Sequence, residues 1–132
     1  MASPCCFHLP ADTATDVITA MEAEVRRIEA KYSRYRDDSV LSRINQNAGQ
    51  TVALDNETLW LINYACACFE QSDGLFDISS GVLRQAWDFR AGQLPSEVTL
   101  ARLLPRIGLS RVEISEAHLT MPPDMELDLG GI

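Results

Sequence analysis

The sequence predicts an α+β domain in which helices pack on a mixed, largely antiparallel sheet. Two long segments carry apolar residues at helical spacing, and a pair of short alternating segments near residue 115 has the pattern of a β-hairpin. The chain has 132 residues, of which 46% are apolar. This length and composition are typical of one globular domain or of one part of a larger domain.

The first long helix is predicted over residues 13–32. Thr13 and Asp16 resemble a capping box at its beginning. Its apolar residues fall within about 80° of one another on a helical wheel, which is typical of an amphipathic helix; they are Val17, Met21, Val25, Ile28 and Tyr32. Before this helix, residues 4–9 are predicted to form a short strand.

The second long helix is predicted from about residue 55 to residue 72. Asp55 or Asn56 would cap it, and Asp73–Gly74 would end it. Its surface is apolar over more than half of its circumference, so we expect it to be more deeply buried than the first helix. Between the two long helices, Ser39 is expected to cap a short helix near residues 40–44.

The second half of the chain is predicted to contain two further helices. Ser79 or Ser80 would cap a helix that runs through Trp87, and Pro95–Ser96 would open another over residues 97–104. We expect Trp60 and Trp87 to belong to the core rather than to a cofactor platform.

Strands are predicted near the end of the chain. Segments 112–114 and 119–121 would form a hairpin joined by residues 115–118, and residues 126–129 are a further strand candidate.

The charge balance and the cysteines exclude several classes of function. The net charge is −8, and the basic residues between positions 26 and 43 alternate with acidic ones, so we expect no nucleic-acid partner. No apolar run approaches the length of about 20 residues that a transmembrane segment needs. The cysteines and His8 and His118 lack metal-ligand spacing, which favours buried reduced thiols over structural zinc and predicts structural or exposed histidines. We found no nucleophilic triad.

Three polar clusters are candidates for chemistry. Residues 32–45 combine hydroxyls, guanidinium groups and an amide, and Tyr35 could stack on a ring; the alternative, a polar loop whose side chains cap turns, is favoured by these residues alone. In residues 73–81, Asp77 either receives a ligand's hydrogen bonds or caps the following helix. In residues 127–132, Asp128 and two glycines either approach a ligand or form a turn.

In this order and with these gaps, the clusters resemble the ApbE family, the FAD:protein FMN transferases. The resemblance rests on Met1-Ala-Ser-Pro-Cys5, on Tyr32-Ser-Arg-Tyr-Arg-Asp-Asp-Ser-Val-Leu-Ser-Arg-Ile-Asn45, on Asp73-Gly-Leu-Phe-Asp-Ile-Ser-Ser-Gly-Val-Leu83 with Trp87, and on Leu127-Asp-Leu-Gly-Gly-Ile132. It covers the whole chain but only the front part of the family's length. The residues at Ala2-Ser3, Ser80, Val82 and Asp88 differ from those usual in the family, and these differences concern the local shape of the expected ligand pocket.

The resemblance implies an Mg²⁺-dependent enzyme that cleaves FAD and attaches FMN, as a phosphodiester, to a Ser or Thr of an acceptor protein. It also implies that Gly131 offers a backbone carbonyl to the metal, and that the following residues contact FAD: Met1, Tyr35, Leu75, Phe76, Asp77 and Asp128. Catalytic residues and the other metal ligands are expected beyond Ile132.

We therefore expect residues 1–132 to be a single N-terminal lobe of an ApbE-like fold that is incomplete at the C-terminus and inactive alone. Its partner would be the missing C-terminal half or a second copy. The alternatives are an FAD- or nucleotide-binding module without transferase activity and an assembly subunit that has lost flavin binding. The location is expected to be cytoplasmic, or periplasmic or membrane-anchored if the N-terminus was trimmed.

Overall fold

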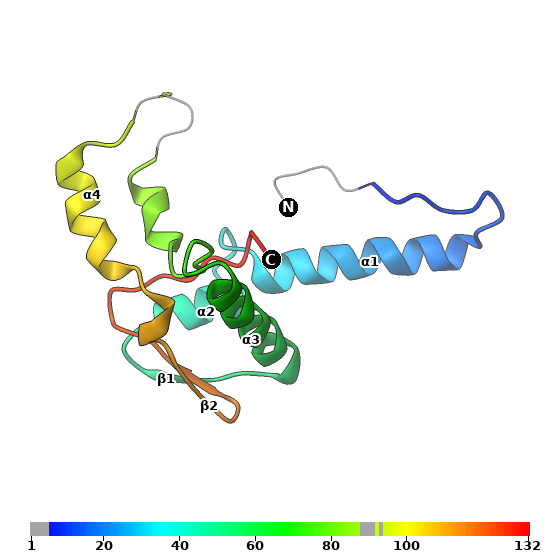
Figure 1. The fold of residues 1–132 in the computed structure, drawn as a ribbon. Coiled ribbons are helices and arrows are strands. Elements are labelled where there is room, and N and C mark those ends of the chain that lie inside the picture. Colours follow the sequence, from blue (N-terminus) through cyan, green and yellow to red (C-terminus); the bar gives the residue numbers. More distant parts are fainter. Residues whose placement is uncertain (1–5, 88–91, 93) are drawn as a thin grey trace.

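The computed structural model describes residues 6–87, 92 and 94–132. Helices and a small sheet alternate along the chain, which confirms the predicted α+β class (Figure 1). The elements are α1 (Thr15–Tyr32), α2 (Val40–Gln46), β1 (Thr51–Ala53), α3 (Asn56–Gln71), η1 (Gly81–Gln85), α4 (Glu97–Leu103), η2 (Leu104–Arg106), η3 (Leu109–Arg111), β2 (Glu113–Ser115) and β3 (His118–Thr120).

The sheet is antiparallel, with the strand order β1-β3-β2. The predicted hairpin of β2 and β3 is confirmed, and Glu116 turns it with φ 53°. β1 was not predicted; it pairs with β3 so that Val52 lies opposite Leu119. The predicted strand at 126–129 is reduced to one parallel bridge between Ser80 and Glu126. Residues 6–9 form no strand, so that prediction is wrong where the structure describes it.

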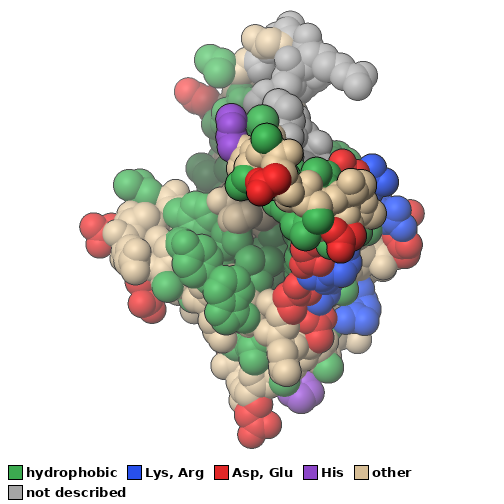
Figure 2. Space-filling model, turned by 90° about the vertical axis from the view of Figure 1, so that its right-hand side faces the viewer, with side chains coloured by type: hydrophobic (Ala, Val, Ile, Leu, Met, Phe, Trp, Pro, Cys, Tyr) green, Lys and Arg blue, Asp and Glu red, His purple; other side chains and the backbone are tan. Residues whose placement is uncertain are grey.

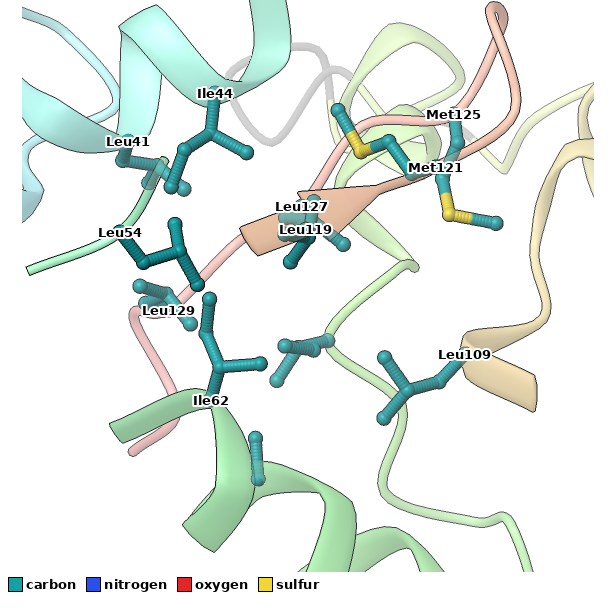
Figure 3. Close-up of a cluster of buried hydrophobic side chains, with 12 residues drawn as sticks. Leu41, Ile44, Leu54, Ile62, Leu109, Leu119, Met121, Met125, Leu127 and Leu129 are labelled. Carbon is teal, nitrogen blue, oxygen red and sulfur yellow. The ribbon is translucent and has the colours of Figure 1, made fainter. Parts of the chain in front are cut away.

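The core lies between α2, α3, the sheet and the last extended segment of the chain (Figure 3). Burial of these side chains supplies the main driving force for folding. The labelled core residues in Figure 3 are Leu41, Ile44, Leu54, Ile62, Leu109, Leu119, Met121, Met125, Leu127 and Leu129.

The capping predictions hold for α2, α3 and α4. The side chains of Ser39, Asp55 and Ser96 each accept a hydrogen bond from a backbone N–H in the first turn of their helix. The capping box of α1 is wrong. Its N-cap is Ala14, and the Thr13 hydroxyl donates instead to the carbonyl of Pro10 at 2.8 Å.

The two long helices differ in burial, as expected. α3 buries Thr58, Ile62 and Ala65, whereas α1 has no buried residue and extends away from the rest of the chain (Figure 1). The C-terminal Tyr32 of α1 packs against the core, whereas Val17 near the other end of its apolar face is 47% exposed. Hydrophobic side chains also gather on the surface shown in Figure 2, beside a group of acidic and basic ones.

Other expectations about burial are wrong. Trp60 lies outside the core, 65% exposed, and stacks on the Tyr64 ring one helical turn later. Trp87 is also exposed. The helix predicted to run through it from a Ser79 or Ser80 cap is instead a short 3-10 helix that ends at Gln85 and has no side-chain cap. Cys6 is exposed and Cys66 is half-buried; neither forms a disulfide.

His8 and His118 are exposed, as predicted. Among the described helices, none has the length and apolar character needed to cross a bilayer.

A charge network fastens α1 to the first turn of α3. Lys31 Nζ donates to Asp55 Oδ1 at 2.8 Å and to Glu57 Oε2 at 2.6 Å, and Arg27 also pairs with Glu57. The hydrogen bond from Lys31 lowers the pKa of Asp55 to about 2. Those from Arg27 and Lys31 lower the pKa of Glu57 to about 2. Both carboxylates therefore favour the folded state when they are ionised.

Replacing Lys31 with Met is expected to lower the free energy of unfolding at neutral pH by at most about 1 kcal/mol, since both carboxylates are more than one-third exposed. The folded pKa values lie below the ordinary 3.8 and 4.5, so the contribution is complete above about pH 4.5 and is lost as the pH falls toward 2. Urea unfolding at neutral and acidic pH measures this difference. The control is Arg26→Met, which removes an exposed pair with Glu22; a loss that is equal at both pH values would contradict the prediction.

Candidate functional site

The segment 124–129 lies at the centre of the candidate site. Its residues alternate: Met125, Leu127 and Leu129 are buried in the core. The acidic residues that alternate with them face arginines from three different parts of the chain. These ion pairs are Asp124 with Arg106 (3.8 Å), Glu126 with Arg84, and Asp128 with Arg34.

The first polar cluster reaches this segment through Asn45. Its Nδ2 donates to the Leu127 carbonyl at 2.9 Å, and its Oδ1 accepts from the Leu127 N–H at 2.9 Å. The Asn45 amide thus satisfies both polar groups of a buried residue in the way that a neighbouring strand would. It fixes the backbone on which Asp128 is carried.

The second polar cluster lies on the other side of the same segment. The Asp128 N–H donates to the Ile78 carbonyl at 2.7 Å, next to the bridge between Ser80 and Glu126. Gly81 makes this approach possible, because a Cβ at its position would lie 2.7 Å from the Glu126 carbonyl oxygen. The three polar clusters of the sequence therefore meet around residues 126–128.

Tyr35 and Asp128 are joined through Arg34. The Arg34 guanidinium pairs with Asp128 Oδ2 and donates to the Tyr35 hydroxyl at 2.9 Å. Its central carbon lies 5.0 Å from the centre of the Tyr35 ring. Arg34 belongs to the first polar cluster but was not predicted individually as a site residue, because its partner Asp128 is distant in the sequence.

Asp77 is turned toward its own chain. Its Oδ1 accepts from the Ser79 N–H at 2.7 Å and from the Ser79 hydroxyl at 2.6 Å, and its Oδ2 accepts from the Leu109 N–H at 3.2 Å. The carboxylate thus fastens the second cluster to η3 rather than capping η1. Its role as a ligand contact stays a prediction.

The Phe76 ring lies against Gly131, just after the segment, where a Cβ would be 3.3 Å from Cε2. Leu75, the predicted contact before it, is 91% exposed. Gly131 itself is exposed. Met1, the remaining predicted contact, lies outside the described residues.

An open groove of about 340 Å³ runs beside the segment. It is predominantly polar, with both acidic and basic side chains, and residues of the first cluster form one wall. The lining includes Arg34, Asp37, Ser42, Asn45, Arg84, Arg106, Asp124 and Glu126.

The described residues do not by themselves compose a magnesium site. Residues 6–87, 92 and 94–132 contain no group of three His, Cys, Asp or Glu side chains placed to hold a metal ion. Asp128, the acid closest in sequence to Gly131, already receives hydrogen bonds from Arg34 and from the Gly130 N–H. Octahedral coordination of Mg²⁺ by oxygen would need ligands beyond these.

Comparisons with known proteins give the same assignment as the clusters. A family model described as "ApbE family" matches residues 1–132. An ApbE protein from Thermotoga maritima is similar, with 27% identity and a TM-score of 0.84 over 93% of this chain. The apo flavinyl transferase ApbE of Pseudomonas stutzeri has 25% identity and a TM-score of 0.80 over 91%.

The flavin transferase ApbE of Vibrio cholerae shares the fold, with 24% identity and a TM-score of 0.78 over 92% of this chain. In each case this chain spans 42% of the length of the matched structure. No curated protein sequence matches the chain.

Proposed function

This chain belongs to the ApbE family, and from that premise we propose that it forms the flavin-binding part of an FAD:protein FMN transferase. The observation that carries the proposal is the meeting of three separate polar clusters at residues 126–128, where Asn45 and Ile78 hold the backbone of one segment from opposite sides. Because the chain spans 42% of its structural relatives, the whole reaction is proposed for the longer fold.

In the proposed reaction, the acceptor's Ser or Thr hydroxyl oxygen forms a bond to the FMN phosphorus of FAD. The bond between that phosphorus and the bridging oxygen of the diphosphate breaks, AMP leaves with the bond's electron pair, and the hydroxyl proton is released. This chain would bind and orient FAD through Met1, Tyr35, Leu75, Phe76, Asp77 and Asp128. The two atoms that form the new bond, the acceptor's hydroxyl oxygen and the FMN phosphorus, belong to the acceptor protein and to FAD, so these residues take no part in the bond exchange themselves.

We also propose that the reaction depends on Mg²⁺, with the Gly131 carbonyl as one ligand and the others supplied from outside the described residues. When bound, the ion would neutralise charge on the diphosphate. This requirement fits a chain with a net charge of −8, which offers little positive charge to an anionic dinucleotide.

Titration of the chain with FAD, followed by flavin fluorescence in the presence and absence of Mg²⁺, tests the proposal. We expect a dissociation constant in the micromolar range, and binding of FMN or AMP alone at least about tenfold weaker, because each contacts only part of the site. Absence of binding up to about 1 mM FAD would contradict the proposed function. Equal affinity for AMP and FAD would instead favour a general nucleotide-binding module.

A further inference from the structure

We infer that Arg34 is a positioning residue of the flavin site, an inference that rests on the function proposed above. Arg34 is not among the residues that the family resemblance assigns to FAD. Its role would be to hold two of those residues, Tyr35 and Asp128, in one arrangement before the ligand arrives.

The contacts of Arg34 reach both residues at once. One terminal nitrogen pairs with Asp128 Oδ2, and the other donates to the Tyr35 hydroxyl at 2.9 Å. The second carboxylate oxygen of Asp128 accepts from the Gly130 N–H at 2.9 Å. Separate donors therefore hold the two oxygens, and the orientation of the carboxylate is set by Arg34 on one side and by the backbone on the other.

Tyr35 depends on Arg34 more strongly than Asp128 does. Its side chain is 76% exposed, so packing does not select its rotamer. The described contacts of its ring and its hydroxyl are both with Arg34. Removal of the guanidinium would leave the ring free to turn, and FAD binding would then have to order it at a cost in conformational entropy.

The fork shape of the guanidinium is essential to this role. Two parallel sets of donors let one side chain bond a carboxylate and a phenol simultaneously, whereas the lysine ammonium is a compact point charge. Arg34 is also partly shielded, since the side chains of Arg34 and Asp128 are 34% and 22% exposed. A partly buried pair is more rigid than the exposed pairs on a protein surface.

Arg36 provides a matched control in the same loop. It donates to Asp38 at 3.0 and 2.8 Å, and their side chains are 54% and 72% exposed. Its described contacts include none of the predicted FAD-binding residues. Arg36→Met therefore removes the same charge and an equally well-formed ion pair without disturbing Tyr35 or Asp128.

The test is an FAD titration of the 132-residue chain carrying Arg34→Met, Arg34→Lys or Arg36→Met, with the unfolding free energy of each variant measured in urea. We expect Arg34→Met to weaken FAD binding about tenfold, Arg34→Lys to restore only part of the loss, and Arg36→Met to change affinity less than about twofold. Full rescue by lysine would overturn the inference, because charge alone would then suffice.

A double-mutant cycle separates positioning from a general structural effect. If Arg34 acts through its two partners, Arg34→Met should add little to the loss already caused by Asp128→Asn combined with Tyr35→Phe. An undiminished loss in that background would overturn the inference, as would wild-type affinity in Arg34→Met. If the wild-type chain binds no FAD, the proposed function itself is contradicted and the inference falls with it.

Discussion

Replacing Asn45 with alanine is expected to lower the free energy of unfolding by about 2–5 kcal/mol and to weaken FAD binding in the same variant. The side chain satisfies both the N–H and the carbonyl of Leu127, a residue that is 1% exposed. Each buried polar group left without a partner costs about 1–3 kcal/mol. Affinity for FAD should fall because Asp128 follows directly on the released backbone. Urea unfolding and FAD titration measure the two effects.

Two further variants show whether this effect is specific. Asn47→Ala removes a comparable amide, which donates to the Arg43 carbonyl at 2.8 Å on the exposed surface of the C-terminal end of α2, so we expect a loss below about 1 kcal/mol. Asn45→Asp keeps the acceptor for the Leu127 N–H but loses the donor to its carbonyl, and should fall between the two. If Asn45→Ala were no less stable than Asn47→Ala, the backbone contact would not hold the segment.

Replacing Asp77 with alanine is expected to lower the free energy of unfolding by about 2–4 kcal/mol, because the N–H groups of Ser79 and Leu109 lose their acceptor. Both residues are buried, at 0% and 4% exposure. Thermal or urea unfolding of the variant measures this loss. A stability equal to that of the wild-type chain would contradict it.

Asp77→Asn separates the structural role from a role in binding. The asparagine keeps one oxygen acceptor, so the variant should stay folded, while the charge that would receive a donor from FAD is lost. We expect FAD affinity to fall about tenfold in this variant, and Asp73→Asn, on an exposed turn residue of the same cluster, to leave it unchanged. Unchanged FAD affinity in Asp77→Asn would show that Asp77 only links the second cluster to η3 and has no role in FAD binding.

Local patterns predicted much of this fold. The caps at Ser39, Asp55 and Ser96 are where the sequence indicated, because a polar residue before an apolar run is a local signal that needs no tertiary contact. The hairpin around Glu116 is equally local. The strand predicted at residues 126–129 is less local: apart from one bridge, a side-chain amide and ion pairs hold this segment instead of a second strand.

Tertiary contacts decided the remainder. The apolar face of α1 indicated an amphipathic helix but not what would cover it, and none of the residues of α1 is fully buried. Trp60 is a second example, since its position on a helix predicts the face on which it lies but not what packs against that face. β1 has only three residues, Thr51–Ala53, too short for a clear alternation, and it depends on pairing with β3.

The candidate site was predicted as three separate polar clusters. The structure brings Asn45 and Ile78 to the segment that carries Asp128, whereas Tyr35, Asp77 and Asp128 do not line the groove beside that segment. The linking residue, Arg34, could not be found from the sequence, because its bond to Asp128 spans 94 positions and arginine is equally common in solvated loops such as the one containing Arg36.

Hydrogen–deuterium exchange of the wild-type chain, with and without FAD, tests most directly whether the clusters form one binding site. We expect FAD to slow exchange together in residues 34–36, 76–79 and 128–131, while α4, which lies outside the site, exchanges as before. Protection confined to a single one of these segments, or found only in α4, would contradict a shared flavin site.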